Sequence, residues 1–201
     1  MNPVKNCIKI AVFASGSGTN AQNLIETFRQ DARYKERLEI ALVVCNNPHA
    51  YVIERARLLD VPCVQLPRNA FVTDQGLLEL LHTYNIAYVV LAGFLQLIPT
   101  WLLEAYPGRI LNIHPALLPK YGGKGMHGMH VHQAVVAARE TQTGITVHVI
   151  DAHYDKGQTL FQATCPVLPT DTPEDVAAHI HILEQTHFPH AVAEYIYSQS
   201  N

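Results

Sequence analysis

Short apolar runs alternate with segments of helical periodicity along the first half of the chain. The runs are rich in Val, Ile, Leu and Ala and cover residues 8–13, 40–44, 62–66, 88–92 and 110–113. Runs of this length and composition predict buried strands. Between two of them, residues 74–84 carry leucines at helical spacing. Such alternation predicts right-handed βαβ units, so we expect an α/β fold with a Rossmann-like, doubly wound, mostly parallel sheet flanked by helices.

The pattern changes after Pro119. Two extended runs, residues 146–150 and 159–167, enclose a polar loop and predict an antiparallel excursion in the C-terminal part of the chain. No linker rich in Pro, Gly or Ser divides the sequence. We therefore expect a single domain over residues 1–201.

A helix start follows the second extended run. Thr172 is a typical N-cap, Pro173 suits the first helical position, and two acidic residues follow in the first turn. This helix is expected to run through Leu183, and a separate last helix is expected over about residues 190–197.

Composition excludes several classes of protein. With 48% hydrophobic and 15% charged residues, the chain is not of the disordered class. Its formal net charge of −3 provides no basic excess for nucleic acid. No apolar run approaches the roughly 20 residues that span a bilayer. Four irregularly spaced cysteines suggest reduced thiols, so we expect a cytoplasmic protein without nucleic-acid or membrane partners.

Ligands of an open parallel sheet bind beyond the carboxyl ends of its strands. Three segments rich in small, polar or Pro residues are predicted to lie there, namely residues 15–20, 93–99 and 112–121. Their coincidence at one edge predicts an active site.

The first of these segments contains the turn Gly-Ser-Gly-Thr-Asn at residues 16–20. Free backbone N–H groups and the helix dipole favour a bound phosphate at such a position. The turn is not a dinucleotide fingerprint, because Asn46 and Asn47 stand where that motif requires an acid. An ordinary strand-to-helix turn, with Thr19 or Asn20 as N-cap, explains the same residues, so both interpretations stay open.

Asn112 and His114 stand two residues apart at a predicted strand end, and their side chains point to the same side of the strand. An amide donor beside an imidazole suits a developing oxyanion. Asp155, in the polar loop at residues 151–157, could pair with His114 and stabilise its protonated form as a general acid. A hydrated histidine and a solvated turn are the alternative interpretations of these segments.

Three further histidines, His127, His130 and His132, lie in a stretch rich in Gly and Met. Metal binding is conceivable there, but no rigid helical ligand spacing is present. We interpret the stretch as a polar connector and expect no metal.

Together these segments resemble the folate-dependent formyltransferases. The matching motifs are ASGSGTNAQ at residues 14–22, LAGF at 91–94, NIHPALLPKY at 112–121, GITVH at 144–148 and the loop at 155–157. The third motif is typical of the wider family. The turn at residues 16–20 is similar to the turn found in one branch of the family, whose members formylate 5-phosphoribosylglycinamide in purine biosynthesis.

The resemblance implies direct attack of the glycinamide amine on the formyl group of 10-formyltetrahydrofolate, a co-substrate, with small-molecule partners only and a monomer or weak homodimer. It implies a nucleotide-binding half over about residues 1–110 and a folate and catalytic half over about residues 111–201. The implied catalytic residues are Asn112, His114 and Asp155. The implied ribonucleotide-binding residues are Gly18, Thr19, Asn20, His181 and Glu184. The implied folate-binding residues are Leu95, Gln96, Leu97, Ile98, Asn112, Asp151, Ala152 and Asp155.

Gln96 departs from the family pattern, in which many members carry Arg.

Three other functions stay open. A formyltetrahydrofolate deformylase usually carries an extra N-terminal domain, for which a first strand at Ile8 leaves no room. A methionyl-tRNA formyltransferase would need a C-terminal RNA-binding domain and a basic surface. A non-catalytic sugar-phosphate module would not need Asn112, His114 and Asp155 together.

Overall fold

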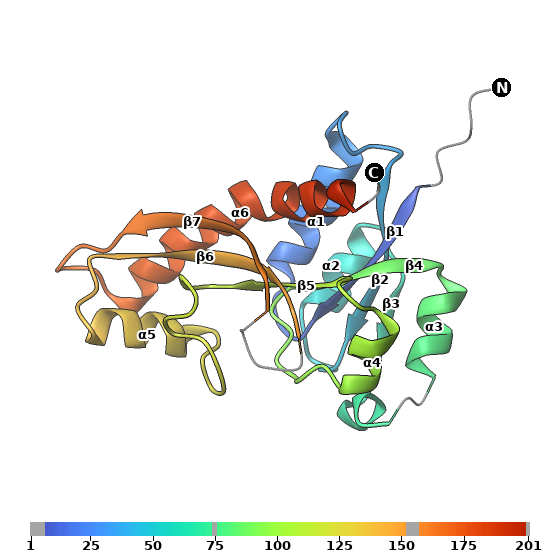
Figure 1. Cartoon of the computed structure of the whole chain (residues 1–201), viewed down its shortest axis with the longest axis horizontal. Coiled ribbons are helices and arrows are strands. Elements are labelled where there is room, and N and C mark those ends of the chain that lie inside the picture. Colours follow the sequence, from blue (N-terminus) through green and yellow to red (C-terminus); the bar gives the residue numbers. More distant parts are fainter. Residues whose placement is uncertain (1–6, 74–75, 152–156, 200–201) are drawn as a thin grey trace. The chain divides into compact units, whose positions relative to one another are not determined.

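The structure is a computed structural model that describes residues 7–73, 76–151 and 157–199. It consists of two compact units, Met1–Ile110 and Leu111–Asn201. The single-domain expectation stays a prediction. The helices and strands of the first unit, labelled in Figure 1, are β1 (Ile8–Ala14), α1 (Thr19–Gln30), β2 (Leu38–Cys45), α2 (Val52–Leu58), β3 (Cys63–Gln65), α3 (Leu77–Thr83), β4 (Ile86–Leu91) and α4 (Thr100–Ala105). A short 3₁₀ helix, η1 (Arg68–Phe71), lies between β3 and α3 in the sequence.

The first unit holds a parallel sheet with the strand order β3-β2-β1-β4. In β1, all side chains from Ile10 to Ala14 are fully buried, as a strand covered on both faces requires. Helices α1 and α2 pack against β2, and α3 packs against β4. The predicted alternation of strands and helices is confirmed, and the strands end where the polar turns were predicted to begin.

The second unit is built around antiparallel strands. Its elements are β5 (Ile110–His114), α5 (Met129–Ala137), β6 (Gln142–Val149), β7 (Thr159–Pro166) and α6 (Pro173–Ser198). Strand β6 pairs antiparallel with both β5 and β7. Helix α6 packs against β6, β7 and α5. The predicted antiparallel excursion and the α/β fold class are confirmed.

The prediction of two C-terminal helices is wrong, because α6 is continuous over 26 residues and contains Pro189. A proline inside a helix removes one backbone hydrogen bond. Here Phe188, Pro189, Val192 and Ile196 are all buried in the apolar face of α6. We attribute the continuity of the helix to this burial, which outweighs the loss.

The N-cap prediction at Thr172 is confirmed. Its side chain accepts the backbone N–H of Asp175, and the Asp175 side chain accepts in return from the Thr172 N–H, forming a capping box. The interpretation of residues 122–132 as a connector is partly wrong, because α5 begins at Met129. Among the described helices, none is long and apolar enough to cross a bilayer.

Candidate functional site

The turn after β1 is shaped by Gly18, whose φ of +77° lies in the left-handed region. A Cβ at this position would lie 2.5 Å from Val52 Cγ2 and 2.8 Å from Val52 Cα. The Val52 backbone N–H donates to the Gly16 carbonyl across 3.1 Å. The turn therefore requires glycine for two reasons, backbone conformation and the close approach of α2.

Helix α1 begins at Thr19, with Gly18 as its N-cap and without a side-chain cap from the described residues. The interpretation in which Thr19 or Asn20 is the N-cap is therefore wrong. The first turn of a helix has N–H groups without intrahelical acceptors, and its dipole favours an anion. An uncapped glycine turn at the start of a 12-residue helix keeps the phosphate interpretation open.

Arg55 of α2 supports this turn, which the sequence analysis did not predict. Its Nε donates to the Ser17 carbonyl across 2.8 Å, and its guanidinium is hydrogen-bonded to the Gln22 side chain. Asn47 supports the other side, because its Nδ2 donates to the Ser15 carbonyl across 3.1 Å. A positive charge and a fixed backbone thus meet at the predicted phosphate turn.

The predicted folate segment follows β4 in the same unit. Phe94 anchors it, with its ring 5.5 Å from that of Phe13 and 5.2 Å from that of Phe71, centroid to centroid. Phe94 is half-buried and Ile98 is buried, whereas Leu95 and Leu97 are 55% and 52% exposed. The segment is therefore anchored at two points and presents two leucines outward.

Asn112 lies on β5 of the second unit, opposite His148 of β6. The Asn112 Nδ2 and the His148 Nε2 are 3.0 Å apart, and the His148 Nδ1 lies 3.3 Å from the Val149 carbonyl oxygen. A carbonyl only accepts, so His148 donates from Nδ1 and accepts the Asn112 amide at Nε2. The fully buried His148 thus fixes which way the Asn112 amide points, a role that was not predicted from the sequence.

His114 follows two residues later on β5 and is 4% exposed. Residues two apart on a strand share a face, so Asn112 and His114 lie on one side of β5. The His114 Nε2 donates to the Tyr121 carbonyl across 2.8 Å. Opposite His114, the Thr146 hydroxyl accepts the Leu118 N–H across 3.0 Å. These contacts hold the segment after β5 against β6.

His132 of α5 is a buried neighbour of this pair, with 6% of its surface exposed. Its Nδ1 has no hydrogen-bond partner among the described residues. Burial, and secondly the nearby His114, lower the pKa of His132. His132 is therefore neutral at pH 7. The interpretation of this stretch as a polar connector did not predict that His132 is a buried residue of α5.

The remaining predicted residues are placed as follows. His181 and Glu184 lie on α6, with 3.8 Å between Nδ1 and Oε2, in the second unit, whereas Gly18, Thr19 and Asn20 lie in the first. Asp151 is described and exposed, just after β6. Ala152 and Asp155 lie outside the described residues. In the part of the chain that the structure describes, no group of three or more His, Cys, Asp or Glu side chains is placed to hold a metal ion.

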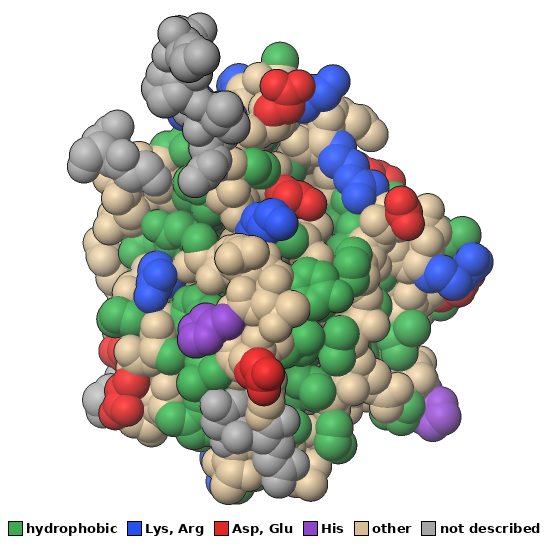
Figure 2. Space-filling view, turned by 90° about the vertical axis from the view of Figure 1, so that its right-hand side faces the viewer, with side chains coloured by type: hydrophobic (Ala, Val, Ile, Leu, Met, Phe, Trp, Pro, Cys, Tyr) green, Lys and Arg blue, Asp and Glu red, His purple; other side chains and the backbone are tan. Residues whose placement is uncertain are grey.

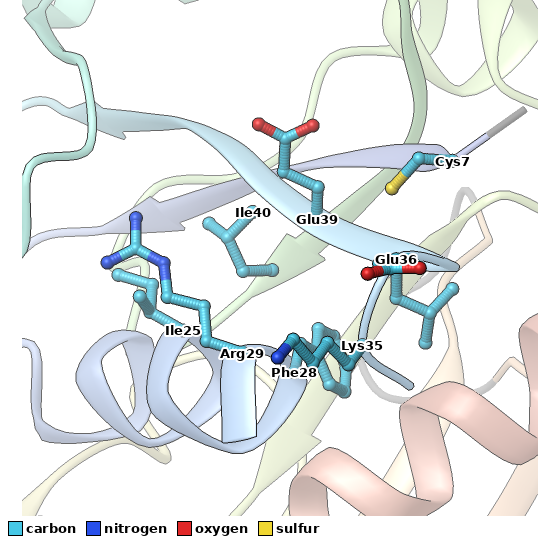
Figure 3. Close-up of a pocket in the computed structure, with 9 residues that line it drawn as sticks. Cys7, Ile25, Phe28, Arg29, Lys35, Glu36, Glu39 and Ile40 are labelled. Atoms are coloured by element: carbon cyan, nitrogen blue, oxygen red, sulfur yellow. The ribbon is translucent and has the colours of Figure 1, made fainter. Parts of the chain in front are cut away.

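A separate cavity of about 280 Å³ lies in the first unit, where β1 and β2 begin rather than where they end (Figure 3). Ile25 and Phe28 of α1 and Ile40 of β2 line it together with charged residues of both signs. Burial, and secondly Glu39, raise the pKa of the Cys7 thiol at its edge. This cavity lies outside all the segments that were predicted to bind ligand.

Charged side chains on one face of the molecule are mixed in sign (Figure 2). On the face drawn in Figure 2, acidic and basic side chains of the described residues are interspersed, with hydrophobic side chains between them. The described part of that face therefore presents no continuous basic patch of the kind that follows a nucleic-acid backbone.

The sequence model of the formyl transferase family matches residues 8–192. A phosphoribosylglycinamide formyltransferase of Bacillus subtilis (strain 168) is 34% identical over 190 residues, which cover 92% of this chain and 93% of that protein. A chloroplastic phosphoribosylglycinamide formyltransferase of Arabidopsis thaliana is 37% identical over 177 residues, or 86% of this chain. The chain spans 60% of the length of that relative and 55% of its counterpart from Vigna unguiculata.

Solved structures give the same result. A phosphoribosylglycinamide formyltransferase from Bacillus halodurans superposes with a TM-score of 0.84 at 32% identity, covering 96% of this chain and 97% of that one. Glycinamide ribonucleotide transformylase 1 from Symbiobacterium toebii superposes with a TM-score of 0.83 at 34% identity, covering 93% and 86% of the two chains. Fold and sequence therefore agree, and the chain belongs to the formyl transferase family.

Proposed function

We propose that this chain transfers the formyl group of 10-formyltetrahydrofolate to the amine of 5-phosphoribosylglycinamide. The observation that carries the proposal is the Asn112–His114 pair on β5, with the Asn112 amide oriented by His148 across 3.0 Å. Family membership and relatives named phosphoribosylglycinamide formyltransferase support the choice of reaction.

In the proposed step, the glycinamide nitrogen forms a bond to the formyl carbon, and the carbonyl oxygen gains negative charge. The bond between that carbon and the folate nitrogen then breaks, and the proton lost by the amine balances the one gained by the folate nitrogen. An amide nitrogen has two N–H groups; His148 accepts one from Asn112, and the second suits the oxyanion. Protonated His114 is the proposed second donor, and Asp155 is proposed to stabilise its charge.

The binding residues follow from the same proposal. The uncapped start of α1, at Gly18, Thr19 and Asn20, would hold the 5′-phosphate, with Arg55 supporting the turn. His181 and Glu184 would bind the ribose. The exposed Leu95 and Leu97 form an apolar surface suited to the flat face of a pterin, within the folate set that also includes Gln96, Ile98, Asp151 and Ala152.

We further propose that the chain works on small molecules alone, in the cytoplasm, as a monomer or weak homodimer and without nucleic acid or a membrane. The net charge of −3 supports the part of this proposal that excludes nucleic acid as a partner.

The test combines the purified protein with both substrates and follows the absorbance of the folate. Formyl transfer should require the ribonucleotide, and His114→Ala should lower the rate about 10²–10³-fold while leaving ribonucleotide binding in place. His82→Ala, which replaces an exposed histidine of α3, is the matched control and should keep full activity.

Each alternative outcome has its own meaning. Equal loss of the formyl group with and without ribonucleotide would identify a hydrolase. Ribonucleotide binding without any change in the folate would identify a non-catalytic module. Normal turnover by the His114→Ala variant would contradict the role given to His114.

A further inference from the structure

A closed ring of hydrogen bonds joins the ends of three strands in the first unit. The Leu95 N–H donates to the Ser15 hydroxyl across 3.0 Å, and that hydroxyl donates to Asn46 Oδ1 across 2.7 Å. The Asn46 Nδ2 then donates to Gln96 Oε1 across 3.2 Å. Since Gln96 directly follows Leu95, the ring closes on the segment after β4.

The hydrogen bonds of the ring all run from donor to acceptor in the same sense, and the ring is largely shielded from water. Ser15 and Asn46 are 7% and 8% exposed. The Ser15 hydroxyl both accepts and donates within the ring, so its proton is committed to Asn46. This commitment fixes the Asn46 amide with its oxygen toward Ser15 and its nitrogen toward Gln96. The Gln96 side chain is therefore required to present an acceptor.

The ring also reaches both predicted ligand-binding segments. The Ser15 N–H donates to the Gly93 carbonyl across 3.1 Å, and the residue after Ser15 begins the glycine turn. Asn47 Nδ2 holds the Ser15 carbonyl across 3.1 Å. On the other side, the ring binds Leu95 and Gln96, the first two residues of the proposed folate segment. A ligand that orders one segment therefore orders groups that the other segment shares.

We propose that Ser15, Asn46 and Gln96 are positioning residues that couple the binding of the folate to the binding of the sugar phosphate. This inference rests on the proposed function for the identity of both ligands. Coupling between two sites is a free energy carried by groups common to both, and it is reciprocal. The ring supplies such groups, so the first ligand bears part of the ordering that the second would otherwise require.

The proposed coupling depends on the type of residue at position 96. The resemblance to the folate-dependent formyltransferases leads one to expect arginine here, and arginine has five donors and no acceptor. An arginine side chain could not take the Asn46 Nδ2–H bond. The coupling through Asn46 is therefore inferred for this chain with its glutamine.

The experiment measures the affinity for 5-phosphoribosylglycinamide by calorimetry, without and with saturating tetrahydrofolate, which lacks a formyl group and so cannot react. The unmodified protein should bind the ribonucleotide about fivefold more tightly when the folate is bound. Gln96→Met, which keeps the length but removes the acceptor, should reduce this ratio to about one. Gln96→Glu keeps an acceptor oxygen and should therefore keep the ratio of the unmodified protein.

A second variant acts on the other end of the same bond. Asn46→Asp keeps the acceptor for Ser15 but removes the donor to Gln96, so it should abolish the coupling as Gln96→Met does. The two changes together should have no larger effect than either alone, because they remove one interaction. Thermal unfolding of each variant shows that it is folded before its coupling ratio is compared.

The outcomes are distinguishable. A protein that binds both ligands with the same ratio in the unmodified and Gln96→Met forms would overturn the coupling while leaving the proposed function intact. A ratio of one in the unmodified protein would do the same. Failure of the unmodified protein to bind either ligand would overturn the proposed function and the coupling with it.

Discussion

Replacing Gly18 by alanine tests whether the turn after β1 is as constrained as its geometry indicates. The left-handed backbone, with φ of +77°, disfavours a residue with a Cβ by about 1–2 kcal/mol. The added Cβ would also lie 2.5 Å from Val52 Cγ2, 2.6 Å from Val52 Cβ and 2.8 Å from Val52 Cα. Overpacking of this kind costs about 1–3 kcal/mol. We expect the free energy of unfolding to fall by about 2–5 kcal/mol.

For a chain of this size, such a loss lowers the melting temperature by about 4–20 °C. Circular dichroism during heating measures the shift, and urea unfolding measures the free energy. Gly16→Ala is the matched control, because nothing lies within 4 Å of a Cβ there and its φ lies outside the left-handed region. Its stability should stay within about 1 kcal/mol of the unmodified protein.

A double variant separates the two causes. Val52→Ala removes the Cγ2 atom but leaves the Cβ atom and the backbone of residue 52 in place, close to the added methyl group, and it does not change the left-handed backbone of residue 18. It should therefore restore little of the stability lost in Gly18→Ala. Equal melting temperatures for Gly18→Ala and Gly16→Ala would refute the reasoning. Complete rescue by Val52→Ala would refute the part assigned to backbone conformation.

Three further changes have expected outcomes. Thr172→Ala removes the capping box of α6 and should lower the free energy of unfolding by about 1 kcal/mol in urea unfolding; an unchanged midpoint would contradict this. Burial, and secondly a neighbouring thiol, raise the pKa of Cys63 to about 11, so its rate of alkylation should rise about tenfold per pH unit through mildly alkaline pH, without levelling off near pH 9. Hydrogen bonds from Lys120 and Tyr121 lower the pKa of Glu140, and a carboxyl lowered in the folded state stabilises above its unfolded pKa and loses that contribution as the pH falls. Glu140→Gln should therefore be less stable than the unmodified protein at pH 7, with the difference shrinking as the pH falls below the usual pKa of a glutamate, as compared by urea midpoints.

The parallel half of the fold was predictable because its determinants are local. A fully buried strand such as β1 needs an uninterrupted apolar run, and the turn after it needs glycine; both are visible in a few consecutive letters. The N-cap at Thr172 is equally local. The same reasoning failed at Pro189, because α6 packs against α5, β6 and β7, and this packing is not visible in the residues around the proline.

The candidate site also divides into residues that the local sequence reveals and partners that it does not. Asn112 and His114 could be selected from their spacing and the prolines around them. The partners that orient them could not, because each depends on strand register or helix packing. Arg55 was passed over because a basic residue in a helix is usually a solvated one, whereas here it binds the Ser17 carbonyl. His132 was assigned to a connector although α5 buries it.

Register is the property on which the proposed chemistry most depends. Asn112 meets His148, and His114 meets Thr146, because β5 and β6 pair antiparallel in one alignment. A slip of one residue would move every side chain of β6 to the other face of the sheet, and the Asn112 amide would lose its acceptor. Gly144 restricts a slip of β6 against its other neighbour, β7, since a Cβ there would lie 2.0 Å from the Ala163 carbonyl oxygen of β7. Strand β6 thus carries both the glycine that β7 approaches closely and the histidine that orients the Asn112 amide, so the packing of the second unit and the proposed stabilisation of the oxyanion depend on the same strand.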